Sequence, residues 1–191
     1  MTLALFLALG GAANAEEIAS QAFVPHPIAG HPVLDMRVGV DRIDTQHPFI
    51  CGEVTALAWL SVEGCGTGSG FLHHGTEPEM AHFRTRGRVW GMDHKRSEID
   101  ALIGVGFAEI QVDEDAHGFK FGQAKEENQV EAAGAEISGS AKGRFWVDKG
   151  GRTYVSGDLN VGMAYIPAAP VVTGGDTKVL PFAAVTVGFG F

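Results

Sequence analysis

The sequence predicts an all-β fold, an eight-stranded antiparallel up-and-down transmembrane β-barrel, on three observations. Apolar and polar residues alternate along almost the whole chain after residue 16, while no helical spacing of apolar residues is sustained. The connections between the alternating segments are short and long in turn, as in an up-and-down barrel. One face of each segment is almost free of charge, and a period of two puts that face on one side of a sheet.

Eight alternating segments are long enough to be strands of such a barrel, because a tilted strand crosses a bilayer with about 9–11 residues. The connections after the second, fourth and sixth segments are short, and the others tend to be longer. Short turns are therefore expected at one end of the barrel and long loops at the other. The segments cover residues 34–43, 49–58, 60–72, 81–91, 98–112, 130–147, 153–167 and 179–191.

The start of the chain has the features of a secretory signal. Leu3 to Leu9 form an apolar core, and Ala13-Asn14-Ala15 provides the small residues of a cleavage site. The expected organisation is a signal peptide over 1–15, a periplasmic lead-in over 16–33 and an outer-membrane barrel over 34–191.

The composition excludes one class of partner and provides no sign of a cofactor. The 191 residues carry a formal net charge of −9, whereas nucleic-acid binding requires a basic surface, so no nucleic-acid partner is expected. The charged share is 19%, below the roughly 25% of typical soluble domains. No nucleotide, metal or catalytic motif with a defensible spacing is present, so neither a cofactor nor a metal site is predicted.

The polar face of the segments contains acids and bases in nearly equal number. Seven carboxylates stand against six cations, which suits a narrow closed interior, because buried charges are tolerated only when they are paired. The predicted interior charge network comprises Asp35, Arg37, Asp41, Glu53, Glu63, Arg84, Arg86, Arg88, Asp100, Glu136, Lys142, Arg144 and Asp158.

Alternation alone does not decide which face is inside, since a soluble lipocalin-like barrel also alternates. The apolar face here is rich in Gly and Ala, which would fill the interior of a soluble barrel poorly. Aromatic residues gather near segment ends, as in the belts at membrane interfaces, although Trp90 and Trp146 have the parity of the polar face. The predicted interface aromatics are Trp59, Trp90, Phe145, Trp146, Tyr165, Phe189 and Phe191.

The two cysteines share the polar parity on neighbouring segments. If the turn between these segments is centred on Ala58, Cys51 lies opposite Cys65 and Glu53 lies opposite Glu63. Opposed residues of an antiparallel pair can approach disulfide distance, so an interior cross-strand disulfide is predicted, with two buried thiols as the alternative. The two glutamates require an arginine between them, which the fourth segment could supply.

The chain closes on VTVGFGF, with Val185, Val187, Phe189 and Phe191 in one parity. Together with the signal sequence and the eight segments, this ending resembles the small eight-stranded outer-membrane proteins of Gram-negative bacteria. In that class a terminal Phe is recognised by the barrel-assembly machinery, so the resemblance implies this machinery as a partner through Phe191. It also implies an outer-membrane location in contact with lipid and lipopolysaccharide.

Few residues suggest catalysis. Histidine and carboxylate side chains gather near the expected outer rim between the third and fourth segments, and such groups can act as general acids and bases. Their spacing matches no known motif, so they are weak candidates only. These catalytic candidates are His73, His74, His82, Ser69 and Glu77. Asp113 could complete a triad with Ser69 and His73.

The predicted function is therefore structural: an outer-membrane barrel with a salt-bridged interior and loops at the cell surface. The long connection over 113–129, with Phe119 and Phe121 among its charges, could bind a surface partner. Two alternatives remain open at this point. One is an outer-membrane lipid-modifying hydrolase or acyltransferase, and the other is a soluble periplasmic lipocalin-like barrel that binds a ligand in an apolar interior.

Overall fold

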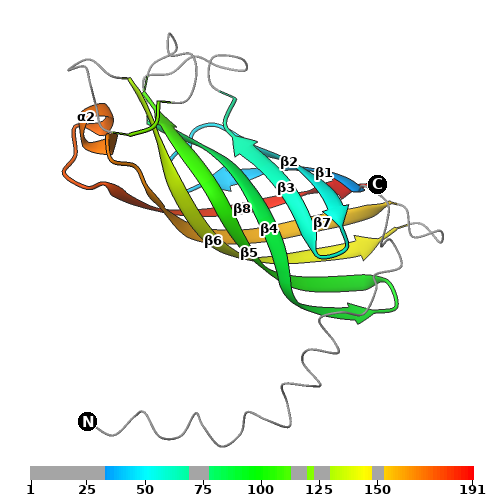
Figure 1. Cartoon of the computed structure of the whole chain (residues 1–191). Helices are drawn as coiled ribbons and strands as arrows, with labels where there is room; N and C mark the ends of the chain where they lie inside the picture. Colours follow the sequence, from blue (N-terminus) through cyan, green and yellow to red (C-terminus); the bar gives the residue numbers. More distant parts are fainter. Residues whose placement is uncertain (1–32, 69–77, 113–119, 123–129, 148–152) are drawn as a thin grey trace, which may run out of the picture.

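The computed structural model describes residues 33–68, 78–112, 120–122, 130–147 and 153–191, so the expected signal peptide lies outside the described residues. Eight antiparallel strands form one closed barrel in chain order, and β1 pairs with β8 (Figure 1). The elements are β1 Val33–Asp41, β2 Phe49–Leu57, β3 Leu60–Gly66, β4 Glu79–His94, β5 Ser97–Gln111, β6 Glu131–Trp146, β7 Tyr154–Tyr165, α2 Ala169–Thr173 and β8 Val179–Gly190.

The predicted fold class is confirmed, and most strand boundaries agree with the alternating segments within a few residues. The third strand is shorter than expected and ends at Gly66. Short turns join β2 to β3 and β4 to β5, whereas the loop that contains α2 lies at the opposite end from the C-terminus (Figure 1).

The short helix α2 was not predicted. Pro170 stands in its first turn, where proline is tolerated, and Gly174 ends the helix with a φ of 68°. No helix within the described ranges is long and apolar enough to cross a membrane.

The strand register shifts between Thr55 and Leu57 in β2 and between Arg88 and Trp90 in β4, and the second shift changes the facing of Trp90. In the β4–β5 pair, Arg88 lies opposite Leu102 and Trp90 lies opposite Ala101, so one extra residue is accommodated in β4. Such a bulge moves the following side chains to the other face of the sheet. The exposed Trp90 side chain consequently lies on the outer surface, although its parity in the sequence is polar.

Two glycines allow the first and last strands to approach each other. A Cβ atom at Gly39 would overlap the backbone carbonyl of Val185, and one at Gly188 would overlap that of Met36. Both glycines lie in the β1–β8 pairing that closes the barrel.

We expect Gly188→Ala to destabilise the barrel by about 1–3 kcal/mol, because the new methyl group would push β1 away from β8. Equilibrium unfolding in urea, followed by tryptophan fluorescence, measures the change. Gly139→Ala is the matched control, since a Cβ there would meet no atom within 4 Å. Equal stability of the two variants would contradict the close approach.

Candidate functional site

The outer surface of the barrel is apolar. Every strand exposes large hydrophobic side chains, among them Val38 on β1, Val62 on β3 and Val161 on β7. An exposed apolar surface that surrounds a whole molecule is far larger than the patches of a few hundred Å² on typical soluble monomers.

The interior has the opposite character. Its central layer contains Arg37 and Arg86, which lie among three buried carboxylates from three different strands. Arg37 Nη1 lies 2.9 Å from an oxygen of Glu53, and Arg86 Nη1 lies 3.2 Å from the same oxygen. Both arginines also pair with Glu63 and Asp158. The repulsion between the opposed glutamates is thus offset by two guanidinium groups.

Lys142 extends this layer from the other side of the barrel. Its side chain has no exposed surface, and Nζ lies 2.7 Å from a Glu53 oxygen and 3.1 Å from an Asp35 oxygen. Arg84 pairs with the second Glu63 oxygen at 2.6 Å and with Glu136 at 3.6 Å. Each of these groups therefore contacts at least one opposite charge.

A second charged layer lies at the end of the short turns. Arg88 and Arg144 both pair with Asp100, at 2.7 and 2.6 Å. Both also reach Glu98, which the sequence analysis did not include although it has the same parity two residues before Asp100. The buried Tyr154 ring lies beside Arg144, with 5.8 Å between the guanidinium carbon and the ring centre.

The loop end of the interior is apolar, which the sequence analysis did not anticipate. Side chains from β4 to β8 form a buried cluster there, and α2 contributes Ala169 and Val172 to it. The cluster comprises Met80, Ala108, Ile110, Ala132, Ala164, Ile166, Ala168, Ala169, Val172 and Phe182.

His82 lies inside the barrel and not on an outer rim, so its expected place in an exposed catalytic cluster is wrong. Only 1% of the residue is exposed, and Nδ1 lies 2.6 Å from a Glu136 oxygen. The imidazole packs between the rings of Phe49 and Phe182, with centroid distances of 5.8 and 4.4 Å. Asp41, the remaining member of the predicted network, is buried in β1.

The other catalytic candidates, Ser69, His73, His74, Glu77 and Asp113, lie outside the described residues, as does most of 113–129. Within that segment, Phe121 is described and packs edge-on against Phe107 on the outer face of β5, with 5.4 Å between the ring centroids. Lys120 Nζ lies 3.5 Å from a Glu131 oxygen.

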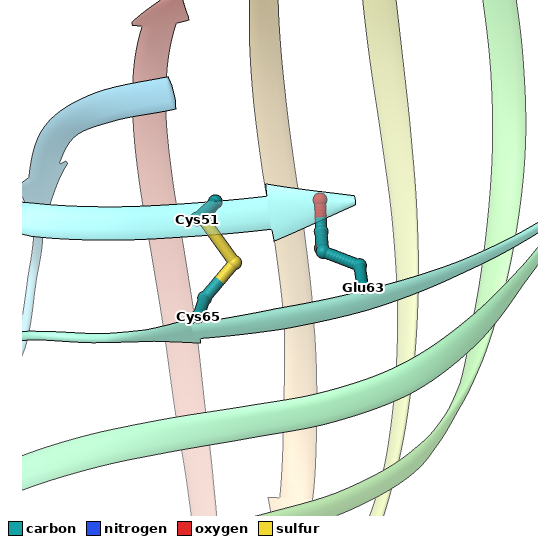
Figure 2. A group of neighbouring side chains, drawn as sticks. All are labelled: Cys51, Glu63 and Cys65. Atoms are coloured by element: carbon teal, nitrogen blue, oxygen red, sulfur yellow. A yellow bond between two sulfur atoms is a disulfide. The ribbon is translucent and has the colours of Figure 1, made fainter. Parts of the chain in front are cut away.

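The predicted disulfide between Cys51 and Cys65 is confirmed. The two residues are directly opposed across β2 and β3, with Cα atoms 4.1 Å apart. Glu63 points to the same side of the sheet as the two sulfurs (Figure 2). The three side chains are of metal-ligand type, but the sulfurs are bonded to each other and neither is a thiolate.

The predicted interface aromatics lie on the outer surface of the barrel, with one exception. Most of the predicted interface aromatics are exposed on the outside, with Tyr165 at the loop end of β7. Trp146 differs from the expectation, because its ring packs against the buried Tyr154, with 4.7 Å between centroids. The predicted interface aromatics that are exposed are Trp59, Trp90, Phe145, Tyr165, Phe189 and Phe191.

The loop between β1 and β2 contains a hydrogen-bonded pair. Asp44 Oδ1 accepts hydrogen bonds from the backbone N–H groups of Gln46 and His47, at 2.8 and 3.2 Å, and Oδ2 lies 2.8 Å from His47 Nδ1. Burial alone would raise the pKa of Asp44, but these hydrogen bonds outweigh it and lower the pKa below its ordinary value.

Comparison with known proteins finds similarity in architecture only. No protein-family model and no curated protein matches the chain. A solved structure, the N-terminal β-barrel domain of Pseudomonas aeruginosa OprF, aligns with a TM-score of 0.43 and 10% sequence identity. The alignment covers 84% of this chain and 100% of that one.

We expect Arg86→Met to lower the free energy of unfolding by about 3–5 kcal/mol, because it would leave Glu53, Glu63 and Asp158 short of a counterion in a buried layer. Urea unfolding provides the measurement. Arg96→Met in the exposed β4–β5 turn is the control and should change stability by no more than about 0.5 kcal/mol. Similar losses in both variants would argue against a paired interior.

Replacing Cys51 and Cys65 together by alanine should lower the free energy of unfolding by about 3 kcal/mol, since the disulfide closes a loop with a sequence separation of 14. The same unfolding experiment, performed under oxidising conditions, tests this. Reduction of the wild-type protein should produce a comparable loss, and unchanged stability in both cases would contradict the expected contribution.

Proposed function

We propose that the protein is a structural barrel of the Gram-negative outer membrane, which anchors surface loops and conducts no solute. The observation that carries this proposal is the reversed distribution of polarity. Charges are buried inside the barrel, and large apolar side chains are exposed on every strand. In water the exposed apolar side chains would be unfavourable. In a bilayer the apolar outer face contacts lipid, and the buried charges remain paired inside the barrel.

Charged residues mark both ends of the apolar outer surface. Near the loop end, acidic residues have the outward parity of their strands at Glu109 on β5 and at Glu131 on β6, and the Glu131 side chain is buried beside Lys120. At the other end, the β4–β5 turn carries exposed charged residues, including Lys95 and Arg96. Polar positions at both ends with an apolar band between them are expected of a strand that crosses a bilayer.

The interior supports a structural role over transport. Buried side chains fill the barrel along its axis. They belong to the central charged layer, to the second charged layer beside Tyr154 and to the apolar cluster under α2. Eight-stranded barrels have an interior just wide enough for side chains to fill. In the proposed orientation, the short turns face the periplasm and the longer loops face the cell exterior, as in bacterial outer-membrane barrels.

The proposal predicts a depth-dependent cost for an outward-facing arginine. Val161→Arg, in the middle of β7 with a 51% exposed side chain, should cost about 2–4 kcal/mol in phospholipid vesicles. Val179→Arg, at the loop end of β8 with 45% exposure, should cost only about 0–1 kcal/mol because it lies near the interface.

The measurement is reversible unfolding of the vesicle-inserted protein, followed by tryptophan fluorescence. A soluble barrel would tolerate both arginines equally, since both positions would be in water. Equal and small effects of the two substitutions would therefore overturn the proposed membrane location.

A further inference from the structure

The most informative feature outside the interior network is a group of three side chains at the loop end of the barrel. Asp44 and His47 come from the β1–β2 loop, and Glu79 is the first residue of β4. Ligand-type atoms of these three residues all lie within 4.8 Å of one another. Glu79 is 32 positions from His47 in the chain, and the folding of the barrel brings it to the β1–β2 loop.

We propose that Asp44, His47 and Glu79 form a binding site for a divalent transition-metal ion of the zinc class. Two carboxylate oxygens and an imidazole nitrogen suit such ions, because imidazole binds Zn²⁺ and its neighbours well, whereas Ca²⁺ and Mg²⁺ prefer oxygen ligands only. Three protein ligands leave a fourth position of a tetrahedral ion for water or another small ligand.

The burial of the two carboxylates supports a cation at this point. Asp44 is 3% exposed and Glu79 is 4% exposed, so both have lost most of their contact with water. Two carboxylates this close repel each other. A divalent ion at this point would compensate both charges.

The ligands are also held in position before any ion binds. The hydrogen bonds from the backbone of Gln46 and His47 fix the Asp44 carboxylate, and the Thr67 hydroxyl donates a hydrogen bond to Glu79. Groups that orient metal ligands in this way strengthen binding. The His47 side chain is 25% exposed, which gives an ion a path from solvent.

The site would tie the β1–β2 loop to the start of β4. It uses no residue of the charged interior network, so it does not depend on that network. The sequence predicted no metal site. This site was not recognised there because its three ligands form no compact sequence motif.

The test is isothermal titration of the folded full-length chain with ZnCl2, in detergent and after treatment with a chelator. Wild-type protein should bind one Zn²⁺ saturably at this site, and CaCl2 or MgCl2 should not compete at equal concentration. His47→Ala and Glu79→Gln should each weaken this binding at least ten-fold. His94→Ala, an exposed histidine at the opposite end of the barrel, is the matched control and should bind as the wild type does.

The difference in SDS gel mobility between unboiled and boiled samples reports whether each variant is folded. If His47→Ala does not fold, Glu79→Gln and Asp44→Asn decide the question, because each keeps the shape of the side chain and removes its charge. Undiminished Zn²⁺ binding by the folded variants would place the ion elsewhere and overturn the proposal. Absence of saturable binding by the wild type would overturn it as well.

Discussion

The structure depends on the pairing of buried charges inside a closed barrel. Arg37 and Arg86 hold Glu53, Glu63 and Asp158 together across the central layer, and Lys142 connects this layer to Asp35. Some of these pairs, such as Arg86 with Asp158 and Lys142 with Asp35, join strands that are not neighbours in the sheet, so they resist collapse of the barrel in a direction that backbone hydrogen bonds do not control. Charges removed from water in this manner are tolerated only because each has an opposite partner.

The interior divides into regions with different physical chemistry. Charged layers occupy the middle and the short-turn end, and an apolar cluster covered by α2 occupies the loop end. His82 lies at the transition, since it contacts Glu136 on one side and the rings of Phe49 and Phe182 on the other. The loop end is closed by hydrophobic burial, which is non-directional and requires no specific pairing of atoms. The ion pairs, in contrast, determine which strands face each other.

Much of the architecture was predictable because a strand has a side-chain period of two. That period identified the two faces of every strand, and the register of β2 and β3 followed from placing their turn at Ala58. The outward position of Trp90 was not predictable, because it depends on a bulge in β4 that a strict period excludes. The apolar cluster was missed because it assembles small side chains such as Ala108 and Ala132 from many strands. The grouping of Asp44 and His47 with Glu79 was not predicted for a similar reason, since only the folded barrel brings them together.

We infer that the apolar face of the barrel contacts lipid and that its charged face is enclosed. This inference is best tested by fractionation of cells that express the protein, combined with gel mobility of unboiled and boiled samples. We expect the native protein to sediment with the outer membrane and to change mobility on boiling, as a closed barrel released from the membrane does. A protein found in the soluble periplasmic fraction with one mobility would contradict the account.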